Sequence, residues 1–192
     1  MVAPERWLKR GWRTFVLNAG AFLGATLILA LGAVISGGLL LIPLGMGLME
    51  MALRARRGEA VTAREVTRGF RFFLPGVLLW LVGVGAGFTV DACSHMPVVG
   101  ALAGAVAAPL LNLFGALSAL CIVDRGVGVR EALGRALLVV EKQWLSLWAV
   151  SLLFLFLQNL GGVFFCIGLL ATVPWIACAW AAAYQDLFDR AG

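Results

Sequence analysis

Histidine is nearly absent from this chain, and charged side chains are scarce. The 192 residues contain one histidine, His95, and charged residues make up 13% of the sequence. Histidine-based metal sites and acid–base catalytic centres need several convergent side chains, which a single histidine cannot supply. The sequence therefore predicts that the protein is not an enzyme and holds no metal ion or cofactor.

Long polar segments are also missing. The hydrophobic fraction is 62%, the mean hydropathy is +0.98, and the stretches between apolar runs are too short to form a separate soluble domain. This composition is typical of membrane proteins with several spans. We expect an all-α integral membrane protein with one membrane domain, residues 1–192, whose first apolar segment is a retained span and not a cleaved signal peptide.

Six apolar segments are expected to cross the membrane as helices. They cover residues 14–35, 39–55, 73–90, 98–123 and 143–157, and a sixth ends at Tyr184. Short turns at residues 36–38 and 158–162, and a polar loop at residues 91–97, are expected to join these segments in pairs on the outer side of the membrane.

Basic residues are confined to one side of this arrangement. The net charge is +5, and the 15 Lys and Arg residues fall in four clusters, at positions 6–13, 54–71, 125–142 and 190. Because the gaps between clusters match the predicted hairpins, all four clusters lie on one side, which is cytoplasmic by the positive-inside rule. We therefore expect a bacterial inner-membrane protein with both termini in the cytoplasm. This placement of charge favours anionic lipid over nucleic acid as a partner.

One segment between two spans has the pattern of an amphipathic interfacial helix. Its basic and apolar positions have the spacing of opposite α-helical faces, with Arg64, Arg68 and Arg71 against Val66, Phe70 and Phe73. Thr62, three residues before Glu65, predicts a capping box at its start. Such a helix lies in the membrane interface with its guanidinium groups toward lipid headgroups.

Similar basic amphipathic helices are expected before residue 14 and at residues 129–142. In the latter, Glu131 and Arg135 are four residues apart and are expected to form an ion pair. The candidate headgroup-binding residues are therefore Arg64, Arg68, Arg71, Arg130 and Arg135.

The segments indicate an internal repeat with a period of roughly 60 residues. Gly11-Trp12-Arg13-x-Phe15 matches Gly69-Phe70-Arg71-x-Phe73, and Pro43, Pro109 and Pro174 each lie 14 to 16 residues before Arg57, Arg125 or Arg190. The expected units are residues 4–58, 62–126 and 129–192. The prolines are expected to kink their helices around a pseudo-threefold axis, with ordinary membrane-helix prolines as the alternative.

Other residues predict contacts between helices. Gly-x-x-x-Gly pairs, which allow close helix packing, occur at Gly20/Gly24, Gly83/Gly87 and Gly100/Gly104. Cys93 and Cys166 both fall on the outer side, so the sequence leaves open whether they form a disulfide. Glu50 has Arg54 one helical turn later, and the two are expected to form an ion pair.

Three stretches carry a resemblance to a known group of proteins. They are R-R-G-E-x-V-T-x-x-E-V-x-x-G-F at positions 56–70, D-R-G-x-x-V-R-E-A-L within positions 119–133, and Pro174 followed by Tyr184. The chain resembles uncharacterised bacterial inner-membrane proteins that are similar to the membrane-anchor domain of glycerophosphodiester phosphodiesterases. The resemblance implies a polytopic α-helical fold. Since the phosphodiesterase catalytic domain is not found in this sequence, the resemblance implies no enzyme activity.

Two functions remain open. The scarcity of polar residues within the spans favours a non-enzymatic scaffold or accessory subunit. It would bind anionic lipid and partner helices, either of other membrane subunits or of a homo-oligomer. The repeats and their prolines favour instead a transporter of small solutes or lipid. For the scaffold we expect a tightly packed bundle without a continuous water-filled channel at Asn112.

Overall fold

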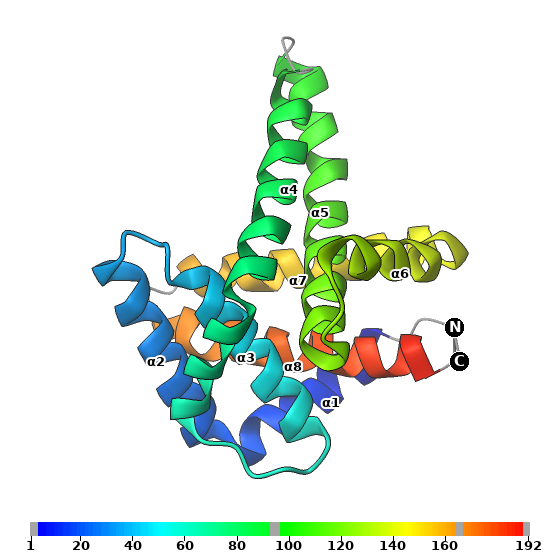
Figure 1. Cartoon of the computed structure of the whole chain (residues 1–192). Coiled ribbons are helices and arrows are strands. Elements are labelled where there is room, and N and C mark those ends of the chain that lie inside the picture. The colour runs from blue at the N-terminus through cyan, green and yellow to red at the C-terminus, as the bar shows by residue number, and fades with distance from the viewer. Residues whose placement is uncertain (1–3, 93–96, 164–166, 190–192) are drawn as a thin grey trace.

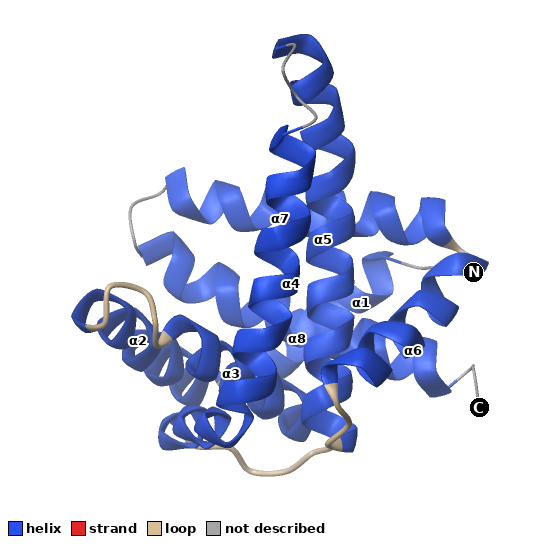
Figure 2. Ribbon diagram, turned by 45° about the horizontal axis from the view of Figure 1, so that its top comes forward, coloured by secondary structure: helices blue, strands red, loops and turns tan. Residues whose placement is uncertain are grey.

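A computed structural model describes residues 4–92, 97–163 and 167–189. Within these ranges the chain is helical and has no strand (Figures 1 and 2). The elements are α1 Pro4–Leu17, α2 Ala19–Ile35, α3 Leu41–Arg56, the 3₁₀-helix η1 Ala63–Phe72, α4 Phe73–Ala92, α5 Pro97–Arg125, α6 Val129–Lys142, α7 Trp144–Val163 and α8 Ile167–Asp189. The all-α prediction is confirmed, as is the helix expected at residues 129–142.

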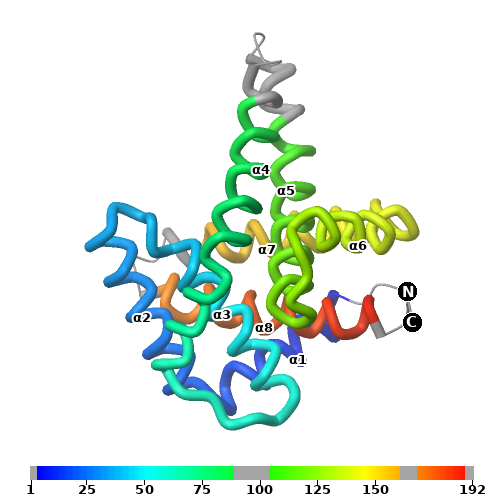
Figure 3. The backbone as a smooth tube through the Cα atoms, viewed as in Figure 1, coloured from blue at the N-terminus to red at the C-terminus, as the bar shows by residue number. Residues whose placement is uncertain are grey.

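The longer helices form three hairpins, α2–α3, α4–α5 and α7–α8. The α4–α5 hairpin projects away from the rest of the molecule, and the other helices gather around its base (Figures 1 and 3). A tight turn joins α2 and α3, and in it Gly37 and Gly38 have φ angles of 59° and 96°. Glycine adopts this left-handed conformation without steric cost. The turn expected at residues 36–38 is confirmed.

Two shorter helices turn sharply into the helices that follow them. The bend is 91° between α1 and α2, and 109° between α6 and α7. At the first break, the Asn18 side chain donates a hydrogen bond to the Thr14 carbonyl over 3.2 Å. The predicted start of the first span at residue 14 is therefore wrong, because residues 14–17 complete α1.

The end of α7 also differs from the prediction. The helix continues to Val163, so the outer turn expected at residues 158–162 is wrong. Asn159 is accommodated within the helix because its side-chain amide donates to the Leu155 carbonyl one turn earlier, over 2.7 Å.

Fewer helices than expected are long and apolar enough to cross a membrane. Among the described residues, Ala63–Phe88 and Gly104–Arg125 meet this requirement, and the number rises to as many as four if each bent pair counts as one span. α2 and α3 have 17 and 16 residues. Helices of that length rise about 24–26 Å, less than the roughly 30 Å of a hydrocarbon core. The structure is consistent with a membrane protein, and the six-span arrangement stays a prediction.

The centre of the molecule is formed by α3, α5 and α8, the three helices that follow the hairpin turns. They contact one another, and each also carries one shorter helix: η1 packs on α3, α6 on α5, and α1 on α8. The first helix of the chain, α1, therefore packs on the last, α8. In α6 the buried residues Ala132, Ala136 and Val140 recur every four positions, as one helical face requires.

Two of these contacts bring backbones together at glycines. A Cβ atom on Gly11 would lie 2.7 Å from the Ala179 backbone nitrogen. On Gly47 it would lie 1.9 Å from the Val66 carbonyl oxygen, and on Gly69 it would lie 1.8 Å from the Pro43 carbonyl oxygen. Only glycine fits at separations this short, so α1 lies directly on α8 and η1 directly on α3.

Candidate functional site

The predicted headgroup-binding face on residues 64–71 does not form, because η1 is a 3₁₀-helix. Side chains three residues apart are eclipsed in this helix type. Arg68 and Arg71 therefore share a row with Glu65, whereas Arg64 falls in the row of Phe70 and Phe73. The third row, Val66, Gly69 and Phe72, faces inward, with Val66 and Gly69 buried. The prediction that Arg64, Arg68 and Arg71 share one face is wrong.

Arg71 is engaged in a partly buried ion pair. Its guanidinium Nη2 lies 2.5 Å from Glu50 Oε1, and its Cζ lies 4.6 Å from the centre of the Phe72 ring. Glu50 is only 7% exposed, and its second oxygen, Oε2, has no hydrogen-bond partner in the described part of the chain. A buried carboxylate is costly without a counter-charge, so Arg71 stabilises the α3–η1 contact.

The expected Glu50–Arg54 pair is therefore wrong. Arg54 instead forms ion pairs with Glu59, over 2.6 Å, and with Glu65. The expected capping box is wrong too, since Thr62 makes no side-chain hydrogen bond to the backbone of η1. Its hydroxyl lies 3.3 Å from the Glu65 carboxylate. These polar groups tie the end of α3 to the start of η1.

The remaining candidate arginines differ in whether they already form an ion pair with an acidic side chain. Arg135 forms the predicted ion pair with Glu131 over 2.6 Å, which is confirmed. Arg68 lies 3.8 Å from Glu65 and keeps 52% of its side chain exposed. Arg64 and Arg130 are exposed. Of the five, Arg64, Arg68 and Arg130 are the most accessible to an anion from outside.

Polar contacts join the C-terminal ends of α3, α5 and α8. Arg57 forms an ion pair with Asp124, and the Tyr184 hydroxyl donates to the same carboxylate over 3.1 Å. Arg56 Nε donates to the Gln185 side chain, also over 3.1 Å. The basic ends of the three central helices therefore lie together at one end of the molecule.

The N-terminal helix is tied to the same end. Asp186 accepts hydrogen bonds from Trp7 Nε1 and from Arg10 Nη1, each over 2.9 Å. Burial lowers the pKa of Arg56 from its ordinary value, nearby Arg10 lowers it further, and Asp186 opposes this shift. The cluster thus couples α1, α3 and α8 through charge as well as packing.

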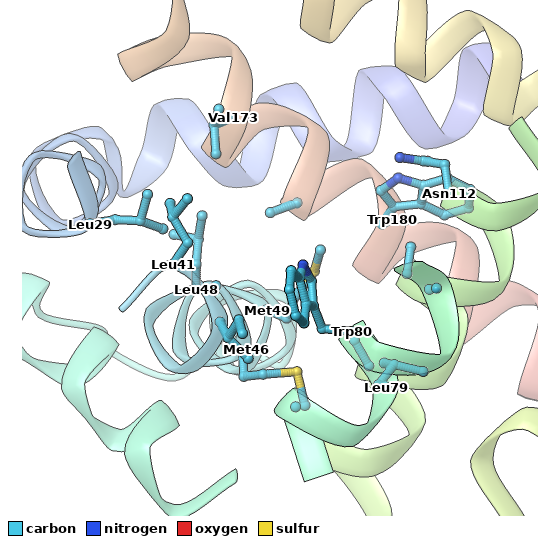
Figure 4. Close-up of a pocket in the computed structure, with 18 of the residues that line it drawn as sticks. Leu29, Leu41, Met46, Leu48, Met49, Leu79, Trp80, Asn112, Val173 and Trp180 are labelled. Atoms are coloured by element: carbon cyan, nitrogen blue, oxygen red, sulfur yellow. The ribbon is translucent and has the colours of Figure 1, made fainter. Parts of the chain in front are cut away.

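A large cavity lies between the central helices, with further walls from α2 and α4 (Figure 4). Its volume is about 1080 Å³, and its lining is mainly apolar, with Asn112 and Gln158 as the amide side chains. In each central helix, the residues two, three and six positions after the proline line it. These are Gly45, Met46 and Met49 in α3, Leu111, Asn112 and Gly115 in α5, and Ile176, Ala177 and Trp180 in α8.

The sequence left open whether the repeats enclose a cavity, and the three repeated prolines lie on the helices that form it. The structure places the prolines differently from the expected three equivalent kinks. Pro43 lies in the first turn of α3, where no backbone N–H donor is required, so the predicted kink there is wrong. Pro109 and Pro174 lie inside α5 and α8, which continue through them.

The polar environment of Pro109 is specific. Ser151 Oγ, fully buried on α7, donates to the Pro109 carbonyl over 2.6 Å and also lies 3.3 Å from Asn112 Oδ1. Trp148 Nε1 donates to the Val106 carbonyl over 3.1 Å. These bonds fix α7 against α5 beside the cavity.

The predicted glycine pairs make few close contacts within the chain. A Cβ on Gly24 would lie 2.8 Å from the Ala63 side chain, whereas at Gly20, Gly83, Gly87 and Gly104 it would meet nothing within 4 Å. Gly83 instead lines the cavity. The surroundings of Gly100, together with Cys93, His95 and Cys166, fall outside the described residues, so the disulfide stays a prediction.

Within the described residues, no group of three His, Cys, Asp or Glu side chains is placed to bind a metal ion. The arrangement instead offers two features for binding: exposed arginines on η1 and α6, and an apolar cavity with a few amide and indole groups. No protein-family model, curated protein or solved structure was found to match this chain.

Proposed function

We propose that this chain is a non-enzymatic integral membrane scaffold or accessory subunit of a bacterial inner membrane, with both termini in the cytoplasm. The observation that carries the proposal is the separation of charge from apolar surface. The basic ends of the central helices gather around Asp124 and Asp186. The hairpins, by contrast, expose large apolar side chains such as Leu74, Phe88 and Phe156, at 67%, 70% and 61%. A surface of this kind is stable when lipid covers it.

The packing of the helices supports the proposed repeat of residues 4–58, 62–126 and 129–192. The short basic helix of each unit packs on the central helix of another unit, in a cyclic order. The second unit packs on the first through η1 and α3, the third on the second through α6 and α5, and the first on the third through α1 and α8. The same cyclic order holds for the outgoing helices, with α4 on α3, α7 on α5 and α2 on α8. This order favours three related hairpins that together make six spans.

We further propose that the short basic helices η1 and α6 bind anionic lipid headgroups. Arg64, Arg68 and Arg130 are the principal groups, because their guanidinium groups are the least paired with acidic side chains. Arg71 and Arg135 are already paired with Glu50 and Glu131. Each well-placed cation contributes about 1 kcal/mol to attraction by an anionic membrane.

Native mass spectrometry of the chain released from gentle detergent tests this proposal. We expect co-purified phosphatidylglycerol, together with a second copy of the chain or another membrane subunit. The R64Q/R68Q/R130Q variant should lose most of this lipid, and the charge-preserving R64K/R68K/R130K variant should retain it. A lone chain with no lipid, or equal lipid on both variants, would contradict the proposal.

The cavity favours a second candidate function, transport of lipid or a small solute. It lies between α3, α5 and α8, and the basic end of these helices is closed by the contacts among Arg57, Asp124 and Tyr184. A transporter must alternate the access to such a site between the two sides of the membrane. Transport would require these contacts to open, whereas the scaffold function does not require them to open.

A further inference from the structure

The deeply buried indole N–H of Trp180, in the cavity wall, has no acceptor in the described part of the chain. Trp180 is only 2% exposed, and its ring packs edge-on against Phe154 at 4.9 Å. Asn112 Oδ1 lies 3.3 Å from Ser151 Oγ, whose single proton is donated to the Pro109 carbonyl. Trp180 lines the cavity from α8 and Asn112 lines it from α5 (Figure 4).

The Trp180 N–H indicates what kind of group the cavity accepts. A buried donor that lacks a partner is costly, and an oxygen atom on an occupant removes that cost. The lining residues carry no formal charge, so a carboxylate or phosphate would be left without a counter-ion. A neutral carbonyl oxygen, such as that of an ester, accepts from the Trp180 N–H without burying a charge.

The rest of the cavity indicates an apolar chain attached to that oxygen. Its volume of about 1080 Å³ is at the upper end of the roughly 300–1,000 Å³ found for ligand sites. Its other walls are mostly Leu, Met, Ile and Gly. Leu39, Leu41 and Trp80 belong both to the lining and to the exposed surface, at 58%, 45% and 54%. An apolar rim of this kind opens to lipid more readily than to water.

We infer that the cavity is a binding site for one acyl chain of a membrane lipid, whose ester carbonyl accepts a hydrogen bond from Trp180. The inference deepens the proposed function, since it rests on the hairpins being embedded in lipid. It concerns a site distinct from the headgroup arginines: those arginines bind charge, whereas this cavity binds an acyl chain through its shape and the neutral Trp180 N–H.

Photolabelling of the full chain in phospholipid nanodiscs tests the site. The probe is a methyl hexadecanoate that carries a diazirine on its chain, and the labelled peptides are identified by mass spectrometry. We expect labels on the cavity-lining segments of α3 and α5, residues 45–49 and 111–116. Filling the cavity with G115L should reduce this labelling by roughly tenfold or more, the ratio produced by overpacking an occupied site.

The chain offers a matched control on the same helix. A Cβ on Gly104 or on Gly115 would meet nothing within 4 Å, but Gly115 lines the cavity and Gly104 does not. G104L should therefore label like the unchanged protein. G45L fills the cavity from α3 and provides a second variant if G115L unfolds in a thermal melt. Equal labelling of G104L, G115L and G45L would overturn the proposed site.

A second probe tests the carbonyl contact. It is the hexadecane of the same length with the same diazirine, which has no oxygen. Removing the Trp180 hydrogen bond in W180F should lower labelling by the ester roughly three- to tenfold and leave labelling by the alkane unchanged. Equal loss with both probes would show that the site is apolar only and would overturn the assignment of an ester.

Membrane fractionation separates failure of this site from failure of the proposed function. A chain that resists extraction by alkaline carbonate but shows no cavity labelling would overturn the acyl site alone. A chain that carbonate releases would overturn the membrane function. The labelling ratio of G115L to G104L, measured in detergent micelles, would then still decide whether the cavity holds an acyl chain.

Discussion

Gly47 and Gly69 lie backbone against backbone where α3 crosses η1. A Cβ on Gly69 would lie 2.4 Å from the Gly47 backbone nitrogen, and a Cβ on Gly47 would lie 3.1 Å from the Gly69 nitrogen. The nearest atoms belong to backbone, which cannot move aside as a flexible side chain can. The crossing therefore determines how closely η1 approaches α3, and with it the position of Arg71 opposite Glu50.

Substitution at this crossing should be strongly destabilising. We expect G69A to lower the free energy of unfolding by about 1–3 kcal/mol or more, because the added methyl group overlaps the Pro43 carbonyl. Thermal unfolding in detergent measures the effect. G20A is the matched control, since a Cβ there meets nothing within 4 Å. Equal melting temperatures for G69A and G20A would contradict the proposed contribution of this crossing to stability.

The Glu50–Arg71 pair should respond unequally to removal of its two partners. R71Q leaves a buried carboxylate without its counter-charge and should cost about 1–3 kcal/mol of stability. E50Q leaves behind an arginine whose side chain is 56% exposed, which water can solvate, so its cost should be smaller. Unfolding of both variants, with R68Q as an exposed-arginine control, measures the difference. A larger loss in E50Q than in R71Q would contradict this account of the pair.

The proposed topology predicts opposite locations for two points of the chain. A reporter fused at Gly58, beyond the end of α3, should be cytoplasmic, because Gly58 follows a cluster of arginines. A reporter fused at His95, between α4 and α5, should lie on the outer side. Paired enzymatic reporters, one active on each side of the membrane, measure both positions. The same location for both fusions would rule out three hairpins of this orientation.

Access to Asn112 distinguishes the scaffold from the transporter. In a background without native cysteines, N112C should react poorly with a membrane-impermeant thiol reagent from either side, because the cavity rim is apolar. S36C, in the turn between α2 and α3, should react from the outer side and serves as the positive control. Two results together would favour the transporter. N112C would react from one side when Asp124 is present, and it would react from the other side when Asp124 is replaced by Asn.

The features that the sequence predicts correctly are those that depend on nearby residues. The apolar face of α6 recurs at a helical period, and the turn at Gly37 and Gly38 requires a backbone that favours glycine. Glu131 and Arg135 pair because they are four residues apart on one helix. Each of these follows from local geometry alone.

The features that it missed depend on contacts between distant segments. Glu50 has Arg54 nearest in sequence, but the packing of η1 on α3 brings Arg71 to it instead. The 3₁₀ form of η1 accompanies the crossing at Gly47 and Gly69, and an analysis of α-helical faces cannot anticipate it. The cavity depends on how three helices pack, so no single segment reveals it.

The contact between Gly11 and Ala179 has a consequence for how the protein is made. Its two partners lie near opposite ends of the chain, so α1 leaves the ribosome long before α8 exists. At typical rates of synthesis the delay is roughly 10–30 s. During that interval the indole of Trp7 and the basic side of α1 have no helix to cover them. The α1–α8 contact can therefore form only when the final segment is released, and until then α1 remains without the helix on which it packs.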